Sequence, residues 1–293
     1  MGRNHARVYS LLEGATLAAV YDQDRSRAEA VVAEFGGQVA ETLGDLAELC
    51  DAVSVVVPTE AHLTVGGELL ERGVSVLVEK PIASTAEDAE ALVRKAAETG
   101  RILQVGHIER FNPVLRELEK QLSHPKFIEA HRLSPFPKRS MDIGVVLDLM
   151  IHDLEVILHL VSSPIASIDA VGVTVLTRHE DIANARLRFE NGCVANITAS
   201  RISPDRMRKI RVFQEECYLS LDYQEQEGKI YYREGQEIGR KEVEVEKDEP
   251  LKLELRAFVE SVKEKKEPTV TGQQGAAALE VALEITRLIQ EQG

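Results

Sequence analysis

The chain has 293 residues, which leaves room for two domains with separate hydrophobic cores at about 100 to 200 residues per domain. Hydrophobic residues make up 44% and charged residues 29%, and this balance excludes an intrinsically disordered chain. The net charge of −14 argues against nucleic acid or an anionic membrane as the main partner, and we expect neither.

The cysteines and the apolar segments bear on location. Cys50, Cys193 and Cys217 are odd in number and lack zinc-binding spacing, so we expect free thiols, no metal site and a cytoplasmic protein. The residues after Met1 lack the apolar core of a signal peptide. The most apolar helical pattern, Val145 to Val161, contains several ionisable side chains, which excludes a membrane span.

From Asn4 to about Val105, helical patterns alternate with short apolar runs, which predicts βαβ units. The runs are continuous and rich in valine, as in strands buried on both faces: Leu17 to Tyr21, Ala52 to Val57, Ser75 to Val78 and Ile102 to Val105. Helices are expected at Arg25 to Phe35 and Ala86 to Thr99, each followed by a glycine. Residues 1–106 are therefore predicted to form an α/β domain with a doubly wound parallel sheet.

After Arg110 the apolar pattern changes to period two, which predicts an antiparallel sheet. The expected strands are Phe127 to Leu133, Ile168 to Leu176, Ile182 to Phe189, Val194 to Ala199, Lys209 to Phe213, Tyr218 to Tyr223 and Lys229 to Tyr232. Helices are expected at about residues 144–161, 251–265 and 275–292. Residues 107–293 are predicted to form a second, α+β domain.

A carboxylate follows the first predicted strand. In a nucleotide-binding βαβ unit, an acid at this place accepts a ribose 2′-hydroxyl and repels a 2′-phosphate, so Asp22 predicts NAD. NADP stays possible if Arg25 meets its phosphate. Gly2 could be the last glycine of the phosphate-binding turn, whereas a solvated turn at Asp22 is the alternative interpretation.

Pro58, Thr59 and His62 follow the strand that ends at Val57, at the edge where open α/β sheets bind ligands. We expect these residues near the cofactor. A helix cap at Thr59 and a structural role for His62 at the start of a helix are the alternatives.

Glu79 and Lys80 end the next buried strand and are followed by Pro81, and we expect both residues to contact the cofactor. At the mouth of the crevice, nicotinamide charge and partial burial would lower the pKa of Lys80 and suit it to proton transfer. The alternative is a surface turn that Pro81 makes rigid.

Asp148 and His152 stand four residues apart in an apolar helix and share one face. A carboxylate one turn from an imidazole can orient the ring and stabilise its charged form, as a general base requires. A lone helix histidine is more often structural. Asp153 lies off that face and is expected to be a supporting or surface group.

Two basic clusters remain. Arg132, Lys138 and Arg139 border a loop just before this helix and could meet a substrate phosphate, although solvated charge is the usual explanation. The second cluster, which includes Arg208 and Arg211, predicts the polar face of a strand or an oligomer contact.

Taken together, these motifs resemble the Gfo/Idh/MocA oxidoreductase family over essentially the whole chain: Gly2-Arg3-Asn4-His5, Glu79-Lys80-Pro81, Gly106 to Pro113 and Asp148 to His152. The resemblance implies a Rossmann domain, a second domain with a large open sheet used in homodimer or homotetramer contacts, and hydride transfer between NAD(P) and a sugar or cyclitol carbon. It also implies that Lys80, Asp148 and His152 are catalytic and contact the substrate.

Within the family, the segments Gly106 to Pro113 and Ser134 to Asp142 resemble members that oxidise the 3-hydroxyl of a UDP-N-acetylhexosamine. The substrate contacts implied in these segments are His107, Arg110, Lys138 and Arg139. The alternatives are an inositol or free-sugar dehydrogenase, an enzyme that recycles a bound cofactor, and a non-catalytic dinucleotide sensor.

The start of the chain raises a further expectation. The first Rossmann strand lies in the middle of its sheet and leads into the first two glycines of the phosphate-binding turn, and neither precedes Gly2. We expect that the natural protein begins about ten residues earlier. The strands that begin at Leu17 and Ala52 would then lack a common partner here.

Overall fold

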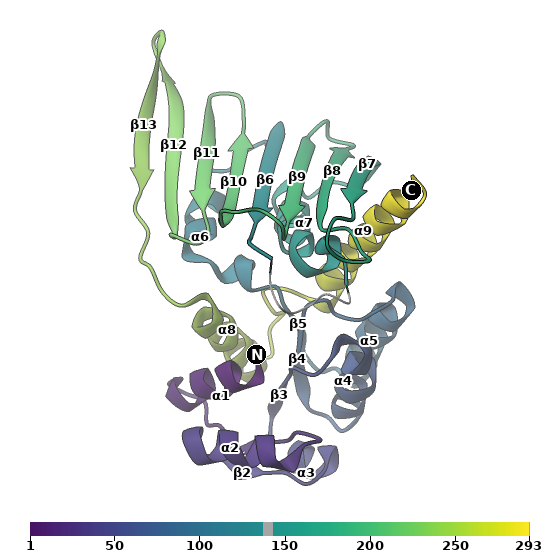
Figure 1. Cartoon of the computed structure of the whole chain (residues 1–293). Helices are drawn as coiled ribbons and strands as arrows, with labels where there is room; N and C mark the ends of the chain where they lie inside the picture. Colours follow the sequence, from purple (N-terminus) through teal and green to yellow (C-terminus); the bar gives the residue numbers. More distant parts are fainter. Residues whose placement is uncertain (137–142, 293) are drawn as a thin grey trace. The chain divides into compact units, whose positions relative to one another are not determined.

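The computed structural model describes residues 1–136 and 143–292, and these form two compact units (Figure 1). The first unit contains Met1–Ile108 and Glu249–Ala276, and the second contains Glu109–Asp248 and the chain from Ala277 onward. The predicted boundary after residue 106 is therefore two residues early. The assignment of Glu249–Ala276 to the second domain was wrong.

Helix α8 (Pro250–Glu264) explains this correction. Its residues Leu251, Leu255 and Phe258 are buried in one cluster with Val8 of α1 (Gly2–Leu11) and Leu77 of β4 (Ser75–Glu79). The apolar stripe of α8 thus has its hydrophobic partner in the N-terminal unit. The helical pattern in the sequence predicts the apolar stripe of α8, but it does not predict which unit covers that stripe.

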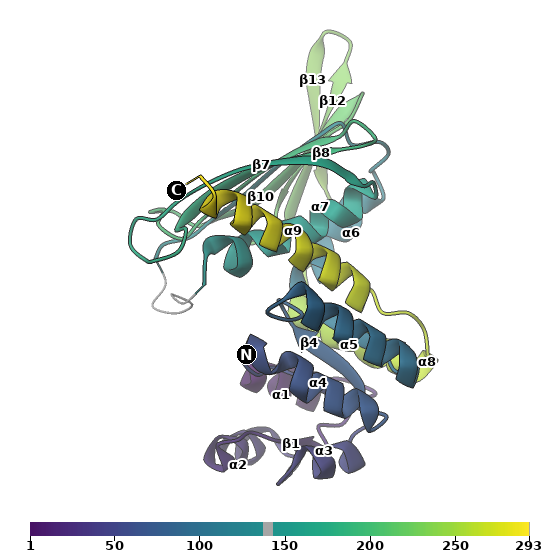
Figure 2. The ribbon, with the colours of Figure 1, turned by 90° about the vertical axis from the view of Figure 1, so that its right-hand side faces the viewer.

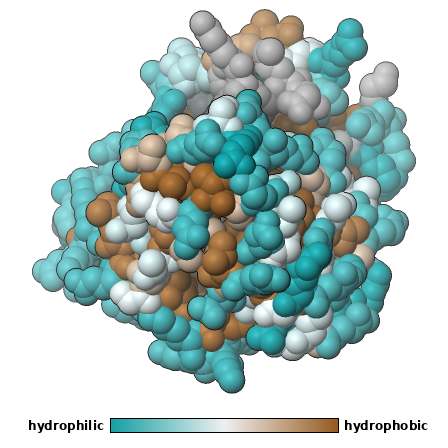
Figure 3. All heavy atoms as spheres, turned by 90° about the horizontal axis from the view of Figure 1, so that it is seen from below, coloured by the Kyte–Doolittle hydropathy of each residue, from teal (hydrophilic) through white to brown (hydrophobic). Residues whose placement is uncertain are grey.

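The first unit holds two separate parallel sheets. Strands β3 (Ala52–Val55), β4 and β5 (Leu103–Gly106) form one, and β1 (Ala19–Val20) pairs only with β2 (Gln38–Val39). Within the described ranges no strand joins β1 to β3. Strand β1 and most of β3 are half-buried, whereas the central strand β4 is buried. Figure 3 shows hydrophobic residues among hydrophilic ones on the face of the molecule seen from below.

Helices connect these strands in the predicted order. They are α2 (Arg25–Phe35), α3 (Leu43–Leu49), the short helix η1 (Thr59–Ala61), α4 (His62–Glu71) and α5 (Ala86–Thr99). The predicted bounds of α2 and α5 are confirmed, because both have clear end signals. Asp24 caps α2 through the Ser26 N–H, and α5 ends at Gly100 in the left-handed region.

The second unit is built on an eight-stranded sheet of order β13-β12-β11-β10-β6-β9-β8-β7. Its strands are β6 (Phe127–Leu133), β7 (Ile165–Val173), β8 (Ile182–Phe189), β9 (Val194–Ser200), β10 (Met207–Phe213), β11 (Cys217–Asp222), β12 (Glu227–Glu234) and β13 (Glu237–Val243). All neighbours are antiparallel except the parallel pair β6 and β9, so the predicted sheet type is confirmed.

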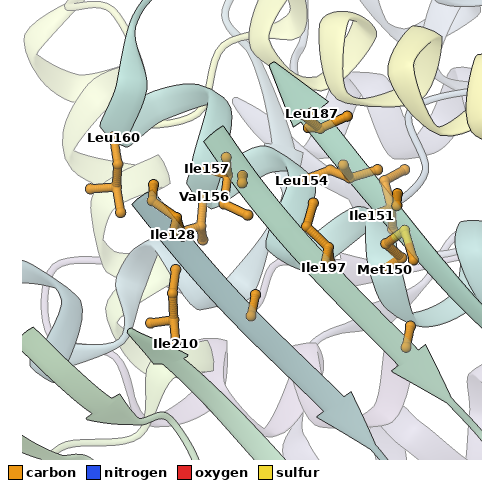
Figure 4. Close-up of a cluster of buried hydrophobic side chains, with 14 of the residues drawn as sticks. Ile128, Met150, Ile151, Leu154, Val156, Ile157, Leu160, Leu187, Ile197 and Ile210 are labelled. Carbon is orange, nitrogen blue, oxygen red and sulfur yellow. The ribbon is translucent and has the colours of Figure 1, made fainter. Parts of the chain in front are cut away.

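Helices cover one face of this sheet (Figure 2). They are α6 (Pro113–Glu119), α7 (Ile151–Val161), the π-helix η3 (Val146–Met150) and the second-unit part of α9 (Gly272–Gln290). Figure 4 shows the core between them, where Leu154 and Ile157 of α7 meet Ile128, Leu187 and Ile197 of the sheet. The other face carries no helix in the part of the chain that the structure describes. Nor is any described helix long and apolar enough to cross a membrane.

Candidate active site

Lys80 lies directly after β4, and its side chain is half-buried. Its backbone N–H donates to Oε2 of Glu79 at 3.3 Å, and Oε1 of Glu79 lies 3.0 Å from Nε2 of His5 on α1. On β5, a Cβ at Gly106 would come within 3.2 Å of the Glu79 carboxyl, so glycine leaves room for this carboxylate. Glu79 therefore anchors the backbone at Lys80 to α1.

His62, at the start of α4, is only 1% exposed. Its Nδ1 lies 3.0 Å from the carbonyl oxygen of Pro81 and 3.3 Å from that of Ile82, and its Nε2 lies 3.1 Å from that of Val57. A buried ring with both nitrogens against backbone carbonyls offers no polar atom to a cofactor. The expected cofactor contact of His62 is therefore replaced by the structural alternative.

Pro58 and Thr59 begin η1, close to the end of β3. Pro58 is exposed and occupies the N-cap position, and Thr59 makes no side-chain capping bond. The capping alternative for Thr59 was thus wrong, whereas the cofactor contacts of both residues stay predictions.

Asp22 follows β1 and is exposed, and its Oδ1 accepts a hydrogen bond from the Asp24 N–H at 2.9 Å. Arg25, also exposed, forms ion pairs with Glu29 at 2.7 Å and with Glu41. Gly2 is the first residue of α1, and a Cβ there would meet no atom within 4 Å. The cofactor contacts of Gly2, Asp22 and Arg25 stay predictions, and Arg25 already pairs with two acids.

The helix with Asp148 and His152 does not run as regular α-helix. Asp148 lies in the π-helix η3, and His152 lies in the first turn of α7. Both side chains are half-buried. Such π-turns are rare and occur frequently at functional sites. Periodicity in sequence could not predict this one, and the pairing of Asp148 with His152 stays a prediction.

Glu180, which the sequence analysis did not single out, holds the start of this helix. Its backbone carbonyl accepts from the Val145 N–H at 3.0 Å, and its carboxylate accepts from the Val146 N–H at 3.2 Å. A Cβ at Gly144 would overlap this carboxylate. A negative side chain at a helix N-terminus also interacts favourably with the positive end of the helix dipole. The only sequence signal was a glycine just before the helix.

Arg201 and Asp181 extend this support. The Arg201 side chain is fully buried, donates to Oδ1 of Asp181 at 2.9 Å and to the Ile143 carbonyl at 2.8 Å. Although burial acts to raise the pKa of Asp181, the backbone N–H groups of Leu176, Thr177 and Val175 and the Arg201 guanidinium hold it well below its usual range. The chain just before η3 is thus tied to a buried ion pair.

The predicted role of Arg132 at a substrate phosphate was wrong. Arg132 is 3% exposed, donates to both carboxylate oxygens of Asp153 at 2.7 and 3.1 Å, and reaches Glu109 at 2.9 Å. Asp153 is 1% exposed, so it is no surface group. Two buried carboxylates occupy this guanidinium, which ties α7 to β6. Period-two burial of β6 would have predicted that Arg132 points to the helices.

Arg110 and His107 are also buried, at 6% and 1% exposure. Nη1 of Arg110 donates to Oε1 of Glu155 at 2.6 Å. This ion pair occupies Nη1 of Arg110, and the substrate contact of Arg110 stays a prediction. The substrate contact of His107 stays a prediction, and Lys138 and Arg139 lie outside the described residues.

Models of two protein families match the chain. One, described as an oxidoreductase family with an NAD-binding Rossmann fold, matches residues 1–107, and the other, the GFO/IDH/MocA C-terminal domain, matches residues 117–220. The chain belongs to the Gfo/Idh/MocA oxidoreductase family. It is an NAD(P)-dependent dehydrogenase, and its Rossmann unit binds NAD.

Relatives within the family extend over nearly the whole chain. UDP-N-acetylglucosamine 3-dehydrogenase of Acidithiobacillus ferrooxidans is 35% identical over 97% of this chain and 93% of its own length. A solved structure of that enzyme has a TM-score of 0.94 and covers 99% of this chain and 94% of its own. The scyllo-inositol 2-dehydrogenase (NAD(+)) of Bacillus subtilis is 27% identical over 98% of this chain and 90% of its own length.

Proposed function

We propose that this Gfo/Idh/MocA oxidoreductase oxidises the 3-hydroxyl of a UDP-linked N-acetylhexosamine with NAD as the hydride acceptor. The observation that carries the proposal is the 35% identity, over 97% of the chain, to UDP-N-acetylglucosamine 3-dehydrogenase. The chemistry of the chain agrees, because Lys80 and the Asp148 and His152 pair are the groups that removal of a hydroxyl proton needs.

The proposed roles follow from the chemistry of each side chain. Bound NAD supplies the hydride acceptor for the alcohol carbon. His152, oriented by Asp148, takes the hydroxyl proton, and Lys80 polarises the same oxygen or relays that proton. Either His152 or Lys80 could be the primary base.

The proposed contacts with the cofactor and the substrate also follow from the chemistry of each side chain. Asp22 accepts from the adenosine ribose, the open start of α1 at Gly2 adjoins the pyrophosphate, and the Pro58 and Thr59 turn contacts the cofactor. Lys138 and Arg139 meet the substrate diphosphate as charge-assisted donors.

The test is NAD reduction followed by absorbance, with UDP-N-acetylglucosamine, UDP-N-acetylgalactosamine, myo-inositol and free glucose as substrates. We expect turnover of a UDP-N-acetylhexosamine only. Lys80→Ala and His152→Ala should each lower kcat by about 100- to 10,000-fold, the usual scale for a positioned acid or base, with folding retained. His124→Ala, which changes an exposed histidine, is the control.

A second candidate is an inositol or free-sugar dehydrogenase, which the similarity to scyllo-inositol 2-dehydrogenase favours. Oxidation of inositol but not of nucleotide sugars would replace the first proposal by this one. NAD binding without turnover of any substrate would instead favour the dinucleotide sensor.

We further propose that the protein is a homodimer or homotetramer that associates through the uncovered face of the eight-stranded sheet. This face carries a ladder of four aromatic rings, Phe127, Phe213, Tyr218 and Tyr231, one from each of four neighbouring strands. All four side chains are half-buried, and they lie on a sheet face that no described helix covers. Aromatic residues are enriched at protein interfaces.

A further inference from the structure

His62 lies between the ends of two neighbouring strands of the first unit. On one side its Nε2 is 3.1 Å from the carbonyl oxygen of Val57, just beyond β3. On the other side its Nδ1 is 3.0 Å from the carbonyl oxygen of Pro81 and 3.3 Å from that of Ile82, in the turn that follows Lys80. The ring thus bridges the turn before Pro58 and Thr59 and the turn that carries Lys80.

The chemistry of these contacts is asymmetric. A carbonyl oxygen only accepts hydrogen bonds, and a neutral imidazole has a single N–H. Only the imidazolium can donate to Val57 and to Pro81 at the same time. In the neutral ring, one nitrogen directs a lone pair at a carbonyl oxygen, and that contact is repulsive rather than bonding.

We propose that His62 is a positioning residue for Lys80: its Nδ1–H holds the Pro81 and Ile82 carbonyls in every protonation state, and its Nε2 bonds Val57 only when the ring is charged. Nδ1 keeps the proton in the neutral ring because it has two acceptors, whereas Nε2 has one. Protonation therefore adds a second tie, between the ends of β3 and β4.

The surroundings set the direction of this change. Burial lowers the pKa of His62, and the carbonyls of Val57, Pro81 and Ile82 and the carboxylate of Glu79 on β4 act in the opposite direction. The other charged neighbours along the chain are Glu60 in η1, which is exposed, and Lys80 itself, which is half-buried. Because burial is the larger effect, the pKa of His62 lies below the ordinary histidine value of 6.5. The ring is therefore neutral at pH 7.5.

The consequence for catalysis rests on the proposed function of Lys80. A loss of the Nδ1 tie frees the Pro81 and Ile82 turn, and a displacement of about 1 Å at a reacting group can cost about 100-fold in rate. The Nε2 tie lies on the Val57 side, away from Lys80. In the neutral ring this tie is absent, so removal of Nε2 leaves the rate nearly unchanged at neutral pH.

The first measurement uses the wild-type chain and no substrate. Two-bond ¹H–¹⁵N spectra report which ring nitrogen carries the proton, and the His62 signal is assigned by its absence in His62→Asn. At pH 8 we expect the Nδ1–H tautomer, which becomes the imidazolium only below pH 6.5. An Nε2–H tautomer at pH 8 overturns the proposal.

The second measurement compares two variants that each keep one donor. An asparagine amide nitrogen replaces Nδ1, and a glutamine amide nitrogen replaces Nε2. At pH 7.5 His62→Asn should keep kcat within about threefold, whereas His62→Gln should lose about 10- to 100-fold, with KM for the sugar within about twofold in both. Equal kcat in the two variants overturns the proposal.

The two measurements separate this inference from the proposed function. If the wild-type chain turns over no nucleotide sugar, the function fails, and the tautomer at pH 8 still decides the role of His62. If the wild type is active and the Asn and Gln variants have equal kcat, the role of His62 fails and the function stands.

Discussion

Asp22 and Arg25 carry opposite charges just after β1, where the adenosine ribose is proposed to bind. The exposed carboxylate of Asp22 is proposed to repel a 2′-phosphate, and Arg25 forms ion pairs with Glu29 and Glu41. We therefore predict a preference for NAD over NADP. Both effects come from single side chains and act through local charge.

The double variant Asp22→Ser with Glu41→Gln should raise kcat/KM for NADP relative to NAD by about tenfold, which corresponds to about 1.4 kcal/mol. The substitutions remove the repelling carboxylate and one of the two acids that hold Arg25. Kinetics with both cofactors measure the change, and Glu90→Gln on α5 is the control for an exposed ion pair. A wild-type preference for NADP would contradict this account and place Arg25 at the phosphate.

Glu155 is a second residue whose charge depends on its surroundings. Burial raises its pKa to about 7, although the Arg110 guanidinium acts in the opposite direction. The folded state thus binds a proton more tightly than the unfolded chain, whose Glu has a pKa near 4.5. The stabilising effect is fully present below pH 4.5 and is lost as the pH rises to about 7, a change of about 3 kcal/mol in the free energy of unfolding.

Glu155→Gln should remove this pH dependence of the free energy of unfolding, because glutamine keeps an acceptor for Arg110 and does not titrate. Urea unfolding at pH 5, 6, 7 and 8 measures this dependence, and Glu117→Gln, which changes a half-buried carboxylate paired with the exposed Lys120, is the control. If the slope of the variant between pH 5 and 7 equals that of the wild type, another group is responsible.

The start of the π-helix is an element whose geometry depends on distant residues. Gly144 leaves space for the Glu180 carboxylate, which accepts the Val146 N–H. A methyl group at Gly144 must displace this carboxylate, and the helix with Asp148 and His152 then loses its cap. Gly144→Ala should therefore lower kcat by about 10- to 100-fold and alter KM less.

The control is a double-mutant cycle with Glu180→Ala, which removes the overlapping carboxylate. If the overlap is the cause, Gly144→Ala adds little to Glu180→Ala in kcat and in Tm. Independent losses that add in the double variant would contradict the proposed contact.

Elements were predictable where short-range signals define them. The cap at Asp24 and the stop at Gly100 gave helices α2 and α5 their bounds. Strand β2 has only two residues, too few for a period, and β13 is a charged edge strand, which masks its alternation. Neither was predicted.

At the scale of the whole molecule, the uncovered sheet face predicts self-association. Its aromatic ladder has ring centroids 5.6, 5.0 and 4.4 Å apart. Tyr218 lies inside this row, so Tyr218→Glu places a charge there and should weaken association at least about tenfold. Arg94→Glu, on α5 of the first unit, is the control for a change of charge.

Sedimentation velocity over a range of protein concentrations measures this association, and circular dichroism checks that the variant is folded. A wild-type chain that stays monomeric at about 100 μM, roughly a hundred times a micromolar Kd, would contradict the proposed oligomer.

The sequence by itself determined the parallel and antiparallel halves and the candidates Lys80, Asp148 and His152, because strand ends and a four-residue spacing are local patterns. Only the tertiary structure decided which charged or polar side chains are free of burial and can contact a substrate or cofactor. Arg132, Arg110 and His62 are buried against partners from other segments, and burial depends on residues far apart in the chain. For the same reason α8 joined the first unit, since its apolar stripe needed a surface that no local pattern describes.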